Sequence, residues 1–134
     1  MIAGVRFQSA AESLAAEAAL FGMGTGSLAP IQLDVTSEES IRSAVAKAGE
    51  LAGPVGLRAL INNAGIVVPG PVEHVSAADW RRQFDVNFFG MVEMTKAALP
   101  LLRQGMAAHG RGMARLLLAS VFDGMLAKEF GMRK

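Results

Sequence analysis

The sequence predicts an α/β fold, an incomplete doubly wound parallel sheet of about four strands with flanking helices. Short apolar runs alternate along the chain with longer segments whose apolar residues recur at helical spacing. The connections between these segments are short, and this alternation is typical of parallel strands joined by right-handed helical crossovers. With 51% hydrophobic and 19% charged residues and no repeat or linker, residues 1–134 are expected to form a single partial domain.

The first half of the chain supplies two predicted strands with a helix between them. Met1–Val5 is an apolar run that predicts a short buried strand. Ser9 and Glu12 match a capping box, which predicts a helix over Ala10–Phe21. Pro30–Val35 is the next apolar run and predicts the second strand.

A second capping box, Thr36 with Glu39, predicts a helix that ends near Gly53-Pro54. Its apolar residues recur at i, i+3, i+4 and i+7, so one face of this helix should pack on the sheet. These residues are Ile41, Ala44, Val45 and Ala48.

The second half supplies two more strands and a long helix. Leu57–Ile61 predicts a strand, and Ser76 is expected to cap the helix that follows it. Asp85–Leu102 reads as a long helix with apolar residues on more than one face, so something besides its own sheet must cover it. The last predicted strand is Leu116–Ala119.

The overall composition excludes several classes of function. The net charge is +1 and the basic residues are scattered, which argues against nucleic-acid binding. The chain has no cysteine, and its two histidines, His74 and His109, lack the spacing of metal ligands, so no metal site is expected. No secretory signal or membrane-spanning run is evident, and we expect a cytoplasmic protein without a membrane partner.

Four motifs occur in order along the chain, and the most specific is an apolar run that ends in Asn-Asn-Ala-Gly, followed by a helical Asn-x-x-Gly. The motifs are Ile31–Thr36, Leu60–Gly65, Phe84–Gly90 and Leu116–Ser120. Together they resemble the short-chain dehydrogenase/reductase family. The resemblance implies a Rossmann-like fold, a nicotinamide cofactor, either NADP(H) or NAD(H), and the oxidation of alcohols or reduction of carbonyls.

Two motifs of that family are absent from this sequence. It contains neither the glycine-rich Thr-Gly-x-x-x-Gly-x-Gly turn after a first strand nor Tyr-x-x-x-Lys, and it has no tyrosine at all. The chain therefore resembles a truncated member. By resemblance the absent first strand would lie centrally, between Met1–Val5 and Leu57–Ile61. We expect this vacancy to be compensated by closure of the two edges, by a second protomer, or not at all, which would leave the fold marginal.

On the adenosine side, the resemblance assigns three residues to cofactor binding. Asp34 would accept a hydrogen bond from the adenine amino group and the Val35 amide would contact the ring. Arg6 follows the strand at which the family selects its cofactor, and an arginine there favours the 2′-phosphate of NADP(H). The alternatives are a strand-ending aspartate beside a helix N-terminus and a solvated surface arginine.

On the nicotinamide side, the resemblance places Asn63, Ala64 and Gly65 along the ribose. Asn87 matches the helical asparagine that holds a water in the proton relay, and an asparagine inside a helix is locally unfavourable without such a reason. Ser120 matches the serine that hydrogen-bonds the substrate oxygen, although a plain strand-ending serine is an alternative. Both positions are therefore candidate catalytic residues.

These observations predict a protein of NAD(P)-dependent alcohol or carbonyl oxidoreductase lineage whose cofactor binding and dehydrogenase activity are weak or lost. If active, it would take a small-molecule substrate. The alternatives are a non-catalytic binding or self-assembling module and an unrelated activity, such as hydrolysis, on the same scaffold. The unfilled sheet and the apolar long helix predict a homo-oligomer.

Overall fold

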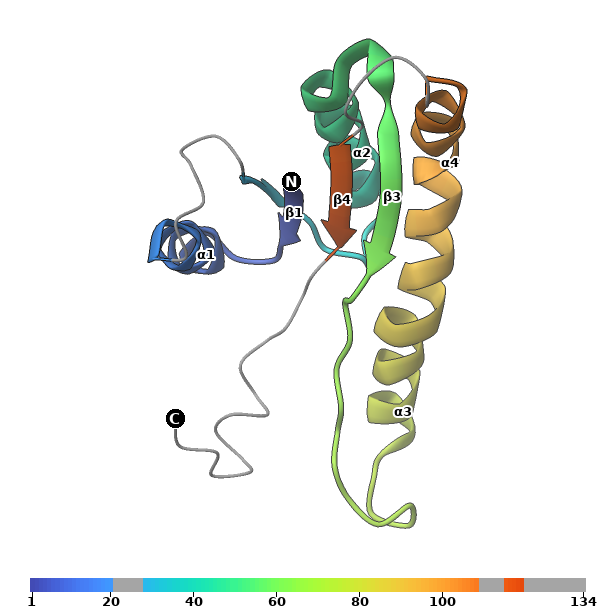
Figure 1. Cartoon of the computed structure of the whole chain (residues 1–134). Coiled ribbons are helices and arrows are strands. Elements are labelled where there is room, and N and C mark those ends of the chain that lie inside the picture. The colour runs from blue at the N-terminus through green and yellow to red at the C-terminus, as the bar shows by residue number, and fades with distance from the viewer. Residues whose placement is uncertain (21–27, 109–114, 120–134) are drawn as a thin grey trace.

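A computed structural model describes residues 1–20, 28–108 and 115–119 of the chain, and these form one parallel sheet with helices on both faces (Figure 1). The strands lie in the order β2-β1-β4-β3, and each adjacent pair is parallel. Their bounds are Ile2–Val5 for β1, Ala29–Gln32 for β2, Leu57–Asn62 for β3 and Arg115–Ala119 for β4. The predicted doubly wound α/β sheet of about four strands is confirmed.

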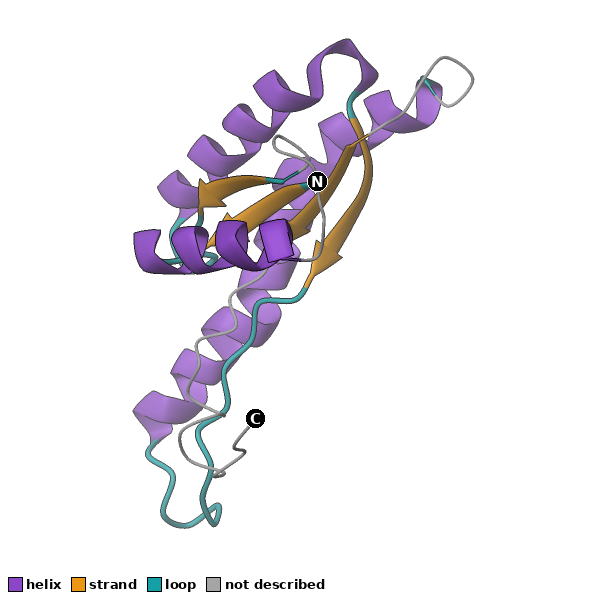
Figure 2. Cartoon of the chain, turned by 60° about the vertical axis from the view of Figure 1, so that its left-hand side comes forward, coloured by secondary structure: helices purple, strands orange, loops and turns teal. Residues whose placement is uncertain are grey.

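The helices divide between the two faces of the sheet (Figure 2). One face carries α1, which contacts β1 and β2, and the other carries α2 and α4, which contact each other as well as β2 and β3. A single turn of 3₁₀ helix, η1, follows α2, and a π-helical segment, η2, joins α3 to α4. The bounds are Gln8–Leu20 for α1, Glu38–Ala52 for α2, Gly53–Val55 for η1, Ala77–Phe84 for α3, Asp85–Gly90 for η2 and Met91–Ala107 for α4.

The centre of the sheet is filled by β4, the last strand in the chain. Leu117 lies opposite Ile2 of β1 and opposite Leu60 of β3. The expectation of an unfilled centre was therefore wrong, and none of the three predicted compensations is needed. An apolar run such as Leu116–Ala119 can be buried equally well at several positions in a parallel sheet, so its pattern does not specify its neighbours.

Two of the three predicted helix caps differ from the structure. Helix α1 begins at Gln8, so Ser9 lies inside its first turn. Helix α2 is capped by Ser37, whose side chain accepts a hydrogen bond from the Ser40 amide, because the Thr36 hydroxyl binds Asp34 instead. The prediction for Ser76 is confirmed, since its hydroxyl accepts a hydrogen bond from the Asp79 amide at the start of α3.

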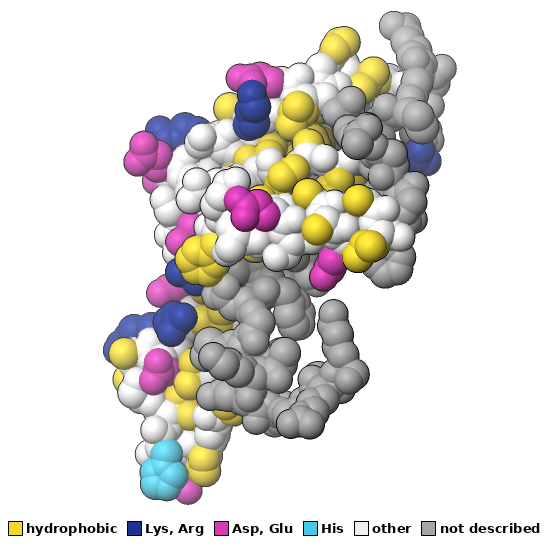
Figure 3. All heavy atoms as spheres, turned by 90° about the vertical axis from the view of Figure 1, so that its left-hand side faces the viewer, with side chains coloured by type: hydrophobic (Ala, Val, Ile, Leu, Met, Phe, Trp, Pro, Cys, Tyr) yellow, Lys and Arg dark blue, Asp and Glu magenta, His cyan; other side chains and the backbone are white. Residues whose placement is uncertain are grey.

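The main core lies between the sheet and the α2/α4 layer. Its fully buried members include Ile2, Leu33, Leu57 and Met94. The predicted apolar face of α2 is confirmed, with three of its four residues buried and Val45 packed at the edge of the core. On the opposite face, Ala11 is the buried residue of α1. Hydrophobic side chains gather on the surface that carries α1, as Figure 3 shows.

Helices α3, η2 and α4 follow one another without a break and project beyond the carboxyl ends of the strands (Figure 1). We call the projecting part, residues 77–90, the arm. A Cβ atom placed on Gly90 would lie 2.8 Å from Val35 Cγ2, so the predicted close packing at this glycine is confirmed. Among the described helices, none has both the length and the apolarity that a bilayer crossing requires.

Candidate functional site

The candidate site lies where the strands end. All four strands are parallel, so their carboxyl ends meet at one edge of the sheet. Arg6 follows β1, Asp34 follows β2, and Asn63 follows β3. Loops at this edge form the ligand site in open α/β sheets. The fold therefore brings the predicted adenosine-side and ribose-side residues to the same edge.

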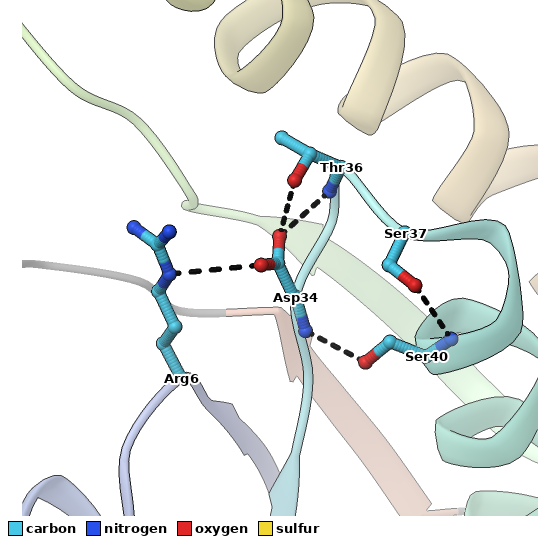
Figure 4. Close-up of polar contacts among 5 residues, drawn as sticks. All are labelled: Arg6, Asp34, Thr36, Ser37 and Ser40. Carbon is cyan, nitrogen blue, oxygen red and sulfur yellow. Dashed lines mark hydrogen bonds and ion pairs between the residues drawn. The ribbon is translucent and has the colours of Figure 1, made fainter.

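Asp34 is the centre of a polar network between the ends of β1 and β2 (Figure 4). Its Oδ1 accepts hydrogen bonds from the Thr36 hydroxyl at 2.6 Å and from the Thr36 amide at 2.9 Å. Its Oδ2 lies 3.7 Å from Arg6 Nε. Because Oδ1 already has two donors, Oδ2 is the oxygen better placed to accept a hydrogen bond from a ligand.

The surroundings of Asp34 favour its charged form. Partial burial by itself raises the pKa of this carboxyl, but the hydrogen bonds from the Thr36 hydroxyl and amide and the charge of Arg6 act in the opposite direction. Their combined effect is larger, so the pKa of Asp34 lies below its usual value. An ionised carboxylate accepts hydrogen bonds, as recognition of an amino group requires.

The neighbours of Asp34 limit what each of them can do. Val35 is buried, so its side chain packs in the core and only its backbone is suited to contact a ligand. The guanidinium of Arg6 lies 5.4 Å from the centre of the Phe7 ring, within cation–π range, as well as near Asp34. The cation is thus placed at the end of β1 by an aromatic ring and a carboxylate.

Asn87 binds the loop that follows β3. Its Oδ1 accepts a hydrogen bond from the Ile66 amide and its Nδ2 donates one to the Ile66 carbonyl, both at 2.8 Å. A Cβ atom placed on Gly65 would lie 3.5 Å from the same Oδ1, so the Asn-Asn-Ala-Gly loop passes directly beside this amide. Both polar groups of the Asn87 side chain are thus engaged with backbone.

A second amide repeats this contact one turn earlier, which sequence reasoning missed. Gln83 Oε1 accepts a hydrogen bond from the Val68 amide at 3.1 Å, while its Nε2 is buried without a partner among the described residues. The available signal was the spacing of four between Gln83 and Asn87, which places two amides on one helix face. The two side chains together hold residues 66–68 against the arm.

The π-helical segment around Asn87 was also missed by the sequence prediction of one continuous helix. Residues Asp85–Gly90 carry it, and Val86 and Gly90 within it are buried. Such segments are rare and occur frequently at functional sites. Here it lies where the helix leaves the sheet and becomes the arm.

Replacing Asn87 with alanine should loosen the loop after β3. The variant leaves the Ile66 amide and carbonyl without their partner, so we expect a loss of about 1–3 kcal/mol in unfolding free energy. Amide hydrogen exchange at Ile66 should accelerate, while exchange in α2 should follow only the global change in stability. Asn62→Ala serves as the control, because it removes the single exposed bond from Asn62 Nδ2 to Thr95 Oγ1. Equal exchange at Ile66 in both variants would contradict this role of Asn87.

The remaining predicted site residue, Ser120, lies outside the described residues. The strand before it ends at Ala119, which is level with Gly4 of β1 and Asn62 of β3. Of the two histidines, His74 is exposed on the loop before α3, and His109 lies outside the described residues. No group of three or more potential metal ligands occurs in the part of the chain that the structure describes.

A hollow of about 250 Å³ lies beside Val35 and Thr36 on the α2/α4 side. It carries three carboxylates, from Glu38, Asp85 and Glu93. Negative charges at this density oppose a dinucleotide diphosphate, so this hollow is unsuited to the phosphate part of such a cofactor. The cluster around Arg6 and Asp34 is the better cofactor candidate.

Comparisons with known proteins agree with this geometry. A family model described as short chain dehydrogenase matches residues 3–113. Mouse retinol dehydrogenase 16 is 45% identical over 85 residues, which cover 63% of this chain and 26% of that protein. Mouse estradiol 17-beta-dehydrogenase 2 is 45% identical over 78 residues, which cover 58% of this chain and 20% of that protein. The chain thus spans about a quarter or less of these two curated relatives.

Solved structures give the same result. A short-chain dehydrogenase/reductase from Brucella melitensis is 29% identical with a TM-score of 0.65, over 75% of this chain and 40% of that one. The putative carbonyl reductase Sniffer of Caenorhabditis elegans is 29% identical with a TM-score of 0.64, over 89% of this chain and 50% of that one. Sequence, fold and site geometry together show that this chain belongs to the short-chain dehydrogenase/reductase family.

Proposed function

We propose that this chain supplies the adenosine side of a nicotinamide dinucleotide site of alcohol or carbonyl oxidoreductase lineage, and that the 134-residue polypeptide has weak or no dehydrogenase activity. The observation that carries the proposal is the cluster of Arg6, Asp34 and Thr36 at the ends of two adjacent strands. It offers an ionised acceptor for an adenine amino group and a guanidinium for a ribose phosphate within one site.

Arg6 supports NADP(H) over NAD(H) as the preferred cofactor. A guanidinium at the end of this strand suits the 2′-phosphate, whereas an acidic residue there would suit a free hydroxyl. The names of the mouse relatives point to retinol-like and steroid alcohols as the substrate class. A small-molecule alcohol or carbonyl compound is accordingly the substrate we propose for any residual activity.

Two features support weak binding and slow chemistry. The central strand β4 leads into Ser120-Val121-Phe122-Asp123, whereas the resemblance calls for a glycine-rich turn whose amides hold the diphosphate. The described residues therefore fit the adenosine part of the cofactor but not its diphosphate. The chain also has no tyrosine, so the phenol that transfers the substrate proton in the family is missing.

Thermal unfolding with nucleotides tests this proposal. Millimolar NADPH or NADH should shift the melting temperature little or not at all. A site with a Kd one hundred times below the ligand concentration would add about 2.7 kcal/mol, or several degrees in a domain of this size. NMR titration with 2′-phosphorylated adenosine should perturb Arg6, Asp34 and Val35, and Arg6→Ala should weaken that effect, with Arg58→Ala as the matched exposed control.

Two outcomes would contradict the proposal. A shift of many degrees with NADPH, together with reduction of an aldehyde or ketone at ordinary family rates, would contradict the weak-activity part. Adenosine phosphate that perturbs neither Arg6 nor Asp34 would contradict the assignment of the adenosine side.

A self-assembling module is the second candidate function. Within the described residues β3 pairs on one side only, so its other edge can add a strand from a second copy. Family members commonly form oligomers, and a homo-oligomer of this chain stays a prediction that sedimentation velocity can test. A cytoplasmic location likewise stays a prediction from the sequence.

A further inference from the structure

The arm carries an exposed apolar stripe. Trp80, Phe84 and Phe88 follow one another at intervals of four residues, and Met91 continues the row three residues later. Their exposed fractions are 40%, 55%, 49% and 41%. Residues at these intervals lie on the same side of a helix. We call these four residues the arm stripe.

The other sides of the arm already have partners. Gln83 and Asn87 bind the backbone of residues 66–68, and Val86 and Gly90 are buried. No described segment covers the arm stripe. Contiguous exposed apolar surface of this kind marks an interaction site.

We propose that residues 120–134 of this same chain cover the arm stripe as an amphipathic helix. Three large apolar residues of this segment, Phe122, Leu126 and Phe130, also follow one another at intervals of four. Two helices whose apolar rows share this interval can interdigitate as ridges and grooves, the commonest way in which helices pack in globular proteins. This inference goes beyond the proposed function and does not depend on it.

The length and the starting point of the segment fit this assignment. It follows Ala119, which is level with Asn62 at the carboxyl end of β3, and the arm projects from this same edge of the sheet (Figure 1). A helix rises about 1.5 Å per residue, so the fifteen residues 120–134 can span roughly 22 Å and the fourteen residues of the arm roughly 21 Å. The segment therefore starts near the arm and has enough length to follow it.

The single tryptophan of the chain provides a direct measurement, because Trp80 belongs to the arm stripe. In the double variant Phe122→Ser/Leu126→Ser, Trp80 emission should shift to longer wavelength and acrylamide should quench it more strongly than in the parent. Leu20→Ser is the matched control, since Leu20 is 85% exposed at the end of α1, and it should leave the emission unchanged. Far-UV circular dichroism confirms that each variant is folded. Emission and quenching that match the parent in the folded double variant would overturn the proposal.

Disulfide trapping separates the chain's own segment from a second copy. The chain has no native cysteine, so a Phe84→Cys/Leu126→Cys variant contains only the designed pair. Mild oxidation should give an intrachain disulfide, seen as a faster-migrating monomer on a non-reducing gel. Leu20→Cys/Leu126→Cys should give little of this product. Disulfides formed only between chains would assign the arm stripe to a second copy and overturn the proposal.

Discussion

A proline at position 117 should abolish the cooperative unfolding transition of this protein. Leu117 lies in β4 and faces Ile2 of β1 on one side and Leu60 of β3 on the other. Proline cannot donate a backbone hydrogen bond and is tolerated essentially at sheet edges only. We expect a loss of about 3 kcal/mol or more, comparable to its cost inside a helix, against a total stability of about 5–15 kcal/mol for a domain.

The matched control is a proline in the edge strand β2. The amides of Ala29 and Leu33 donate to β1, and a natural proline already occupies position 30 between them. By the alternation of a strand, the amide of Gln32 points away from β1, so Gln32→Pro should be much less destabilising. Urea unfolding followed by circular dichroism compares the two variants. A cooperative transition in Leu117→Pro as stable as that of Gln32→Pro would contradict the central position of β4.

Gly105→Ala should be the second most damaging change. A Cβ atom at this position would lie 1.8 Å from the carbonyl oxygen of Leu57, a backbone atom at the start of β3. In a helix, alanine is normally favoured over glycine by about 1 kcal/mol. Here the collision requires α4 to move away from β3, so we expect a net loss of about 1–3 kcal/mol or more.

Gly49→Ala in α2 is the matched control for this substitution. Its Cβ atom would lie 3.3 Å from the Leu101 side chain, whose Cδ2 can move by a small rotation. We expect this variant to be nearly neutral or slightly stabilised, because the gain in helix propensity is then retained. Thermal and urea unfolding of both variants measure the difference. If Gly105→Ala were as stable as Gly49→Ala, the close contact between α4 and β3 would be wrong.

Local patterns in the sequence predicted the elements of this fold well. The i, i+3, i+4, i+7 pattern of α2 gave its buried face, and Ser76 gave the start of α3. Each of these features is determined within a few residues. The position of β4 was wrong because strand order depends on pairing between distant segments, and the same apolar run suits several positions.

The candidate site was predictable in position but not in detail. The strand ends placed Arg6 and Asp34 at one edge, as the structure shows. Sequence reasoning did not foresee that Thr36 would bind Asp34 instead of capping α2, because the same hydroxyl suits either partner. It also assigned Asn87 to a water, whereas its side chain binds the Ile66 backbone. Such choices depend on which groups the tertiary fold brings into reach.

The strand that completes this sheet is also the last to be synthesised, since residue 2 pairs with residue 117. Until the ribosome has released β4, β1 and β3 have no neighbour between them, and their backbone groups must remain hydrated or bind another chain. Contacts at such long sequence separation slow folding and prolong exposure to aggregation. Translation of this protein should therefore leave a vulnerable nascent chain, which makes its yield in cells sensitive to chaperone supply and growth temperature.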